Sequence, residues 1–234
     1  LFRSVLRSRH LNLKYHTASL LEVESGSNDP FSYMLTTIVL SVMHGGSSGG
    51  QFAAMLAAQI GYGVLFGVVL PLGARWVLGR FRFSAGFDAV FAVAVALLSY
   101  VLPEMLGGNG YLSVYLTGMI LGNSRIPNKS GLVHFFDAAT ALMQMVLFFL
   151  LGLLAFPSQL PHIAPRALLI ALFLTFVARP AVLALLLTPF RAPLRQQLLV
   201  SWSGLRGAAS IVFAIMATMH PAVMQNDVDR KSVV

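Results

Sequence analysis

Residues 18–43 read ASLLEVESGSNDPFSYMLTTIVLSVM, an apolar stretch interrupted by the polar heptad Glu-Ser-Gly-Ser-Asn-Asp-Pro at residues 24–30. The stretch is long enough to cross a bilayer as a helix, which needs about 20 mostly apolar residues. Glu24 and Asp29 therefore lie where hydrocarbon normally excludes charge, at a cost of at least about 2.5 kcal/mol each. Because intramembrane carboxylates are rare and mostly functional, this heptad is the first candidate for a functional site.

The composition favours an integral membrane protein. The chain is 57% hydrophobic and only 10% charged, whereas soluble domains carry about 25% charged residues. Cysteine is absent, which excludes disulfides and thiolate metal sites. No nucleic-acid-binding motif accompanies the net charge of +8. We therefore expect no cofactor, no resident metal and no nucleic-acid partner.

Seven apolar segments predict an all-α polytopic membrane protein with about seven transmembrane helices. Their approximate bounds are 18–43, 52–72, 87–106, 111–121, 132–156, 167–187 and 197–219. The loops at 1–17, 73–86, 122–131 and 188–196 carry eleven Lys and Arg residues, and the opposite loops carry one, Arg166. The positive-inside rule places the basic loops in the cytoplasm, so the positive charge is interpreted as a topology signal.

Helical spacing places Ser25 and Asp29 on one face of the first segment, with Glu24 and Asn28 on an adjacent face. Pro30 removes one backbone donor, which can free carbonyl groups to line a polar cavity. Asp29 is therefore the candidate site for a cation or a proton, and Ser25 would supply a neutral oxygen. The alternative is that Asp29 only caps a kinked helix.

Arg179 lies within the sixth segment, in the sequence Phe-Val-Ala-Arg-Pro. An ion pair between Glu24 and Arg179 would neutralise both charges and link two helices, and Asn28 could hydrogen-bond within it. The alternative is that Arg179 lies near the cytoplasmic end of its helix and reaches the lipid headgroups.

The seventh segment contains Gly204, Arg206 and Gly207. Two glycines around an arginine predict a helix broken at the membrane midplane, where Arg206 would balance carbonyl ends. Close helix packing through the small residues is a second interpretation, compatible with the first. Of the other polar residues, Asp88 and Asp137 are interpreted as surface charges, and Glu104 as the end of a helix.

The chain does not begin with Met and shows no signal peptide, so we expect a fragment of a longer protein. Residues 229–234, DRKSVV, match the translation of a common sequencing adapter, and we expect them to be non-native. Native codons at the genomic locus would contradict this. Residues 1–228 are then interpreted as one partial transmembrane domain.

Five motifs in order resemble those of the monovalent cation:proton antiporter family, and most closely its NhaP-type potassium/proton branch, also called cell volume regulation protein A. They are the heptad at 24–30, GYLSVYLTGMILGN at 110–123, LFFLLGLL at 147–154, FVARP at 176–180 and WSGLRG at 202–207. The resemblance implies a fold of about thirteen helices with inverted repeats, a dimerisation domain and a mobile core domain. This chain would hold helices six to twelve of that fold.

The resemblance also implies roles for individual residues. Asp29 would bind the cation or the proton, beside Asn28 and Ser25. Glu24 and Arg179 would form the structural ion pair. Arg206 would lie on the unwound crossing helix with Gly204 and Gly207. A homodimer in the cell inner membrane is implied as well, and a chain lacking the first five helices could not transport alone.

The expected function is electroneutral exchange of K⁺ or Na⁺ for H⁺ by alternating access. One carboxylate would bind either the cation or the proton. Because the empty, charged carboxylate is costly to move through a dry barrier, the two fluxes would be coupled. A passive cation channel is the alternative, because a pore could use the same residues. An intramembrane hydrolase is disfavoured, because no deep histidine accompanies a serine and no second deep aspartate accompanies Asp29.

Overall fold

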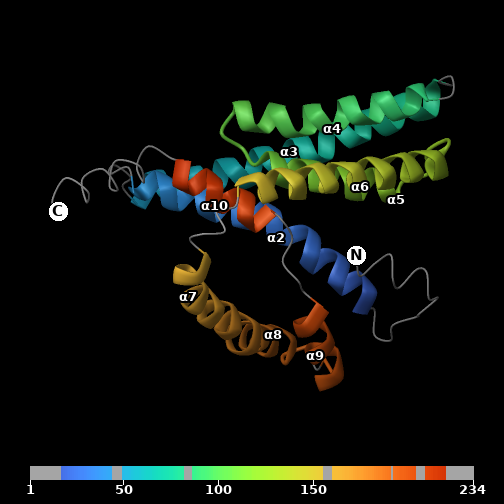
Figure 1. Ribbon diagram of the computed structural model, residues 1–234. Coiled ribbons are helices and arrows are strands. Elements are labelled where there is room, and N and C mark those ends of the chain that lie inside the picture. The colour runs from blue at the N-terminus through green and yellow to red at the C-terminus, as the bar shows by residue number, and fades with distance from the viewer. Residues whose placement is uncertain are drawn as a thin grey trace. The chain divides into compact units, whose positions relative to one another are not determined.

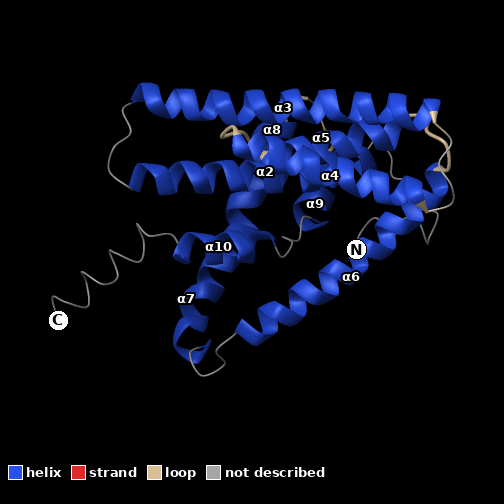
Figure 2. Cartoon of the chain, turned by 90° about the horizontal axis from the view of Figure 1, so that it is seen from above, coloured by secondary structure: helices blue, strands red, loops and turns tan. Residues whose placement is uncertain are grey.

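The computed structural model describes residues 17–43, 49–81, 86–154, 160–190, 192–203 and 209–219. Within these ranges all regular structure is helical (Figures 1 and 2), which confirms the predicted all-α class. The helices are α2 (Thr17–Met43), α3 (Gly49–Arg80), α4 (Phe87–Met105), α5 (Gly110–Asn123), α6 (Lys129–Leu154), α7 (Leu160–Phe173), the π-helical turn η2 (Leu174–Ala178), α8 (Arg179–Leu187), α9 (Leu194–Ser203) and α10 (Ala209–Met219).

Four stretches of the described chain are long and apolar enough to cross a membrane. They are Gly50–Arg80, Phe87–Met105, Lys129–Leu153 and Ala164–Leu187. The helix α2 is long enough to cross a membrane, at 27 residues, but its polar heptad lowers its mean hydropathy, and it is not among these four. The chain is thus a multi-pass membrane protein, whereas seven spans and a thirteen-helix repeat stay predictions.

Two predicted loops are partly helical. The helix α3 continues to Arg80, so Arg75 and Arg80 lie on an exposed helical surface, and the predicted loop at 73–86 was wrong for its first eight residues. A helix satisfies its own backbone, so it can continue beyond the apolar stretch. Likewise α7 begins at Leu160, inside the predicted loop at 157–166, with a proline at its second position where proline is tolerated.

The chain divides into two compact units. One comprises Leu1–Ser25 with Phe148–Gly207, and the other comprises Gly26–Leu147 with Ala208–Val234. The boundaries fall within α2 and α6, so each of these helices contributes residues to both units.

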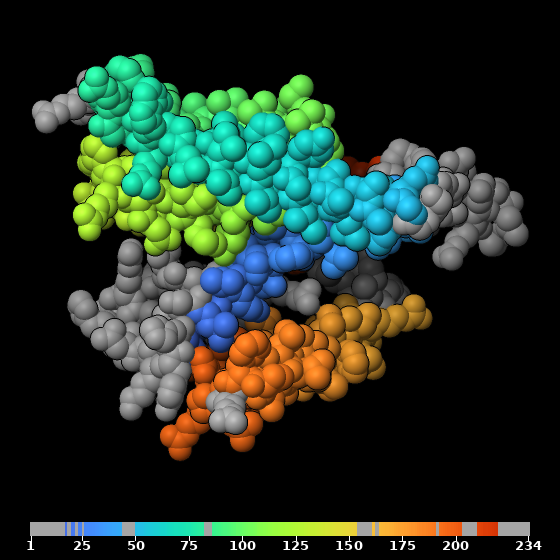
Figure 3. Space-filling model, turned by 180° about the vertical axis from the view of Figure 1, so that it is seen from behind, coloured from blue at the N-terminus to red at the C-terminus, as the bar shows by residue number. Residues whose placement is uncertain are grey.

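In the second unit, α3, α4 and α5 pack against one another (Figures 1 and 3). The buried stripe of α3 repeats every four residues at Gln59, Gly63, Gly67 and Pro71, which is the spacing of one helical face. A Cβ atom added at Gly67 would lie 2.9 Å from Leu116 Cβ. Small residues therefore let the backbones approach closely, as is typical of helix pairs in membranes.

An aromatic cluster joins four helices of the same unit. The ring of Tyr111 on α5 lies 4.8 Å from Tyr33 on α2, 5.4 Å from Tyr100 on α4 and 5.6 Å from Phe213 on α10, centroid to centroid. The last two pairs meet edge to face, an arrangement favoured by the ring quadrupoles.

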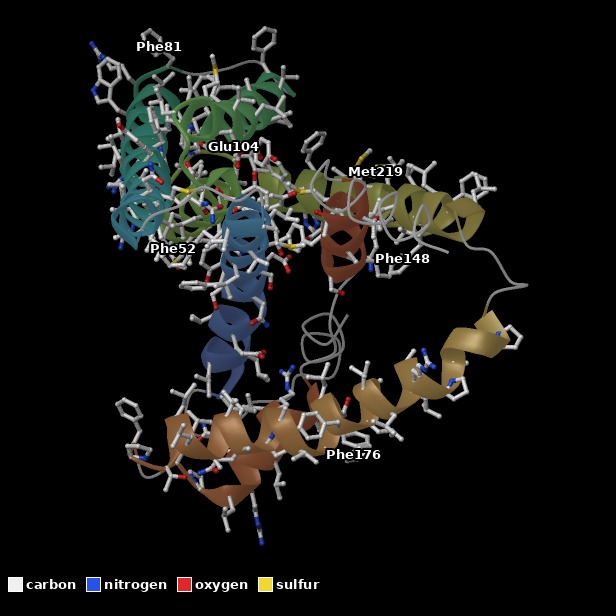
Figure 4. The ribbon with its side chains drawn as sticks, turned by 90° about the vertical axis from the view of Figure 1, so that its left-hand side faces the viewer. Phe52, Phe81, Glu104, Phe148, Phe176 and Met219 are labelled. Carbon is white, nitrogen blue, oxygen red and sulfur yellow. The ribbon has the colours of Figure 1, made fainter. Side chains whose placement is uncertain are left out.

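The first unit contains α7, η2, α8 and α9, which contact one another in sequence order. At the π-helical turn the backbone N–H of Arg179 donates to Leu174 O, five residues earlier. Pro180 follows immediately and lacks the N–H that a regular helix would require. The wider turn accommodates this proline, and such turns recur at functional sites; Phe176 marks it in Figure 4.

Candidate functional site

The polar heptad lies within α2, as the sequence predicts for residues 24–30. Asn28 and Asp29 are exposed on this helix, and Pro30 is buried. Within the described ranges, no salt bridge is formed by the Asp29 carboxylate. Ser25 lies one turn before Asp29 on the same helix, but its side chain is outside the described part.

Glu24 is in direct contact with Arg179. The Nη2 atom of Arg179 donates to Glu24 Oε1 at 2.5 Å, and the two side chains retain 18% and 22% of their exposure, Arg179 first. The interaction connects α2 to the first residue of α8, directly after the π-helical turn. This is the charge pair that the sequence analysis expects, and it neutralises the carboxylate one turn before the Asn-Asp pair.

The third predicted feature falls outside the described residues. The helix α9 ends at Ser203 and α10 begins at Ala209. Gly204, Arg206 and Gly207 lie between them, so the broken helix stays a prediction.

A second polar face of α2 makes contacts that the sequence did not reveal. Asn109 Nδ2 donates to Pro30 O at 2.8 Å, and Gln59 Nε2 donates to Thr37 Oγ1 at 3.0 Å. The acceptors are seven residues apart, so they share one face of the helix. The only signal in the sequence was an asparagine at the start of a predicted helix, where Asn is a favoured cap.

Glu104 lies at the end of α4, as expected, and it also joins two other helices (Figure 4). Its carboxylate accepts hydrogen bonds from the Tyr33 hydroxyl on α2 at 2.9 Å and from the backbone N–H of Gly110 on α5 at 3.0 Å. The group is therefore part of the packing of this unit.

The interpretation of Asp88 as a surface charge was wrong. Its side chain is only 9% exposed, and it accepts hydrogen bonds from Asn128 Nδ2 at 2.5 Å and from the backbone N–H of Ala89 at 2.9 Å. A carboxylate in the first turn of α4 satisfies free N–H groups there, and Asn128 covers it. Asp137, in contrast, is exposed as expected.

The described part of the chain is helical and contains four stretches that are long and apolar enough to cross a membrane, which is typical of a multi-pass membrane protein. The chain belongs to the family described as sodium/hydrogen exchanger, transmembrane, whose model matches residues 4–231. This finding agrees with the resemblance that the motifs indicated.

Individual relatives agree with this assignment. The chain is 37% identical over 220 residues to the K(+)/H(+) antiporter NhaP of Alkalimonas amylolytica, covering 91% of this chain and 37% of that protein. It is 34% identical to the K(+)/H(+) antiporter NhaP2 of Shewanella oneidensis, covering 92% and 38%. A Methanocaldococcus jannaschii protein named "Probable Na(+)/H(+) antiporter 2" is 23% identical, with 93% and 56% covered.

The chain thus spans less than two fifths of the length of the NhaP relatives. No solved structure gives a significant match.

Proposed function

We propose that the chain forms part of the transport domain of a secondary antiporter that exchanges a monovalent cation for H⁺ across the cell inner membrane. The contrast between two carboxylates carries this proposal. Glu24 is paired with Arg179, whereas Asp29, five residues later on the same helix, is exposed and forms no salt bridge within the described ranges. One carboxylate therefore serves structure, and the other is available to a ligand.

A single available carboxylate couples the two fluxes. A cation and a proton compete for the same negative charge, and either one neutralises it. An empty, charged Asp29 is expensive to carry through a dry barrier. Only loaded carriers then cross during alternating access, so one cation is exchanged for one proton and the cycle is electroneutral.

Neighbouring groups complete the proposed site. Ser25 and backbone carbonyls would contribute neutral oxygens, which suit a hard monovalent cation. Asn28 is neutral, so it does not admit a second proton as a carboxylate would. Gly204, Arg206 and Gly207 would form the crossing broken helix, where Arg206 balances carbonyl ends.

We propose K⁺ as the first cation to test and Na⁺ as the second. The relatives at 37% and 34% identity are named K⁺/H⁺ antiporters, and the one at 23% carries a Na⁺/H⁺ name. We further propose a homodimer, as the family resemblance implies.

The test reconstitutes the full-length protein in vesicles that contain a pH-sensitive dye. Wild type should show cation-dependent proton movement, and Asp29→Asn should lose it, because an amide cannot take up and release a proton. Asp137→Asn is the matched control, since this exposed carboxylate lies on α6, and it should retain exchange. Wild-type exchange in Asp29→Asn would exclude Asp29 as the carrier.

The same vesicles separate an antiporter from a channel. Clamping the membrane potential at several values should leave the rate of an electroneutral exchanger unchanged. A flux that follows voltage, without proton movement in proportion to the cation, would show a passive pore instead.

A further inference from the structure

We infer that Asn109 is a positioning residue for Asp29, because its buried side chain holds the backbone of α2 at the next residue, Pro30. This inference rests on the proposed role of Asp29 as the exchange site. It assigns a function in ion binding to a residue of the turn between α4 and α5, outside the polar heptad.

The geometry of Asn109 connects three helices through one residue. The side chain is 1% exposed. Its Nδ2 donates to Pro30 O on α2 at 2.8 Å, and its Oδ1 accepts from the backbone N–H of Leu112 on α5 at 3.0 Å. Its own backbone N–H donates to Gln59 O on α3 at 3.1 Å. The carboxamide therefore both caps α5 and holds α2.

Asn109 holds α2 at Pro30, where the hydrogen-bond ladder of the helix lacks one donor. Pro30 has no backbone N–H, so the carbonyl of Gly26 loses the donor that a regular helix would supply. Helices bend at such positions. A hydrogen bond from a neighbouring helix to Pro30 O anchors the chain where its own ladder is interrupted, one residue from the carboxylate.

The contacts of α2 also fix its rotation. A helix turns about 100° per residue, so Gly26, Pro30, Tyr33 and Thr37 share one face. That face meets Tyr115 at Gly26, Asn109 at Pro30, Glu104 at Tyr33 and Gln59 at Thr37. Asp29 is about 100° away from Pro30 on this helix, and it is exposed. Of these contacts, the Asn109 bond is the one nearest to Asp29, so its loss would free the backbone beside Asp29 and would misplace the carboxylate.

Capping and positioning can be separated by substitution. Asn109→Ser keeps a good N-cap, but the serine side chain is too short to reach Pro30 O. Asn109→Thr also keeps a capping hydroxyl, and it removes the Nδ2 donor without adding a charge. The matched control is Thr117→Val, which removes the buried hydrogen bond from Thr117 Oγ1 to Ser99 Oγ, at 3.0 Å between α5 and α4. This control leaves every contact of α2 in place.

The experiment measures exchange by the reconstituted full-length protein against cation concentration and pH, together with its thermal midpoint in detergent. Asn109→Ser and Asn109→Thr should raise the half-maximal cation concentration roughly three- to tenfold, the worth of one hydrogen bond, with a smaller change in maximal rate. Their pH profiles should shift as well, because cation and proton share the misplaced group. Thr117→Val should lower the thermal midpoint and leave the half-maximal concentration unchanged.

Three results would overturn the inference. The first is an unchanged half-maximal concentration in both Asn109 variants. The second is an equal rise in Thr117→Val. The third is failure of both Asn109 variants to accumulate in the membrane, which would assign Asn109 a general structural role. Asp29→Asn is measured alongside: if it remains active, the proposed exchange site is wrong, whereas its inactivity with unaffected Asn109 variants rejects only the positioning role.

Discussion

At the scale of single residues, two carboxylates on one helix have opposite environments. Glu24 contacts a guanidinium and keeps 22% of its exposure, and Asp29 is exposed. Removing one partner of an ion pair in a low dielectric destabilises the fold, because the other partner is left as an uncompensated charge. We propose that the Glu24–Arg179 pair has a structural role, which can be tested apart from transport.

We predict that Glu24→Gln lowers the stability of the full-length protein by about 2 kcal/mol. This is less than the 3–5 kcal/mol typical of a fully buried pair, because both side chains keep partial solvent access. The measurement is the thermal midpoint in detergent. Glu24→Gln combined with Arg179→Gln should recover most of the loss and should retain exchange. A double variant that is less stable than both single variants, or that is stable and inactive, would contradict a purely structural pair.

At the scale of elements, the helix α3 shows how glycine placement decides packing. Gly67 is buried against α5, and a Cβ there would come within 2.9 Å of Leu116 Cβ and 3.1 Å of Ser113 Cα. Gly73, on the same helix, is exposed, and a Cβ there would meet no atom within 4 Å. Both glycines lie in the same helix, so a substitution at each differs mainly in the packing that the new Cβ would meet.

We predict opposite effects of one substitution at these two sites. Gly67→Ala should destabilise by about 1–3 kcal/mol, because the contacts at Cα and Cβ atoms require the two helices to separate. Gly73→Ala should stabilise by up to about 1 kcal/mol, because alanine favours the helix. Thermal midpoints of the two variants in the same detergent provide the comparison. Equal shifts of the same sign would mean that α3 and α5 do not pack as described.

At the scale of the whole molecule, the distribution of basic residues predicts the orientation of the spans. The loop at 122–131 is expected in the cytoplasm and the turn at 107–110 outside. Arg75 and Arg80 lie on α3 and still count, because the rule includes charges near the ends of spans.

Cysteine labelling tests this orientation, since this chain contains no cysteine of its own. Met105→Cys, at a residue that is 77% exposed near the end of α4, should react with an impermeant maleimide added to intact cells. Ser130→Cys, exposed near the start of α6, should react only after the cells are opened. The reverse pattern would invert the topology and place the basic loops outside.

The class of fold and one contact of the candidate site could be predicted from the sequence alone. The apolar lengths predicted an all-helical membrane protein, because hydropathy and helix length are local properties. The contact of Glu24 with Arg179, 155 residues away, was expected because a charge in the membrane needs a partner and few were available. The extension of α3 to Arg80 was not expected, because a helix can continue beyond its apolar stretch. The burial of Asp88 was not expected either, because the polarity of a residue does not show which other segment packs over it.

Only the tertiary structure decided which neutral polar groups meet. Asn109 and Pro30 are 79 residues apart, and Tyr33 and Glu104 are 71 apart. Nothing in their residue types singles out these partners, since an amide or a hydroxyl finds acceptors on almost any helix. Their pairing follows from the packing of α3, α4 and α5 through small residues, and from the close approach of α2 to α5 at Gly26, where an added Cβ would clash with Tyr115.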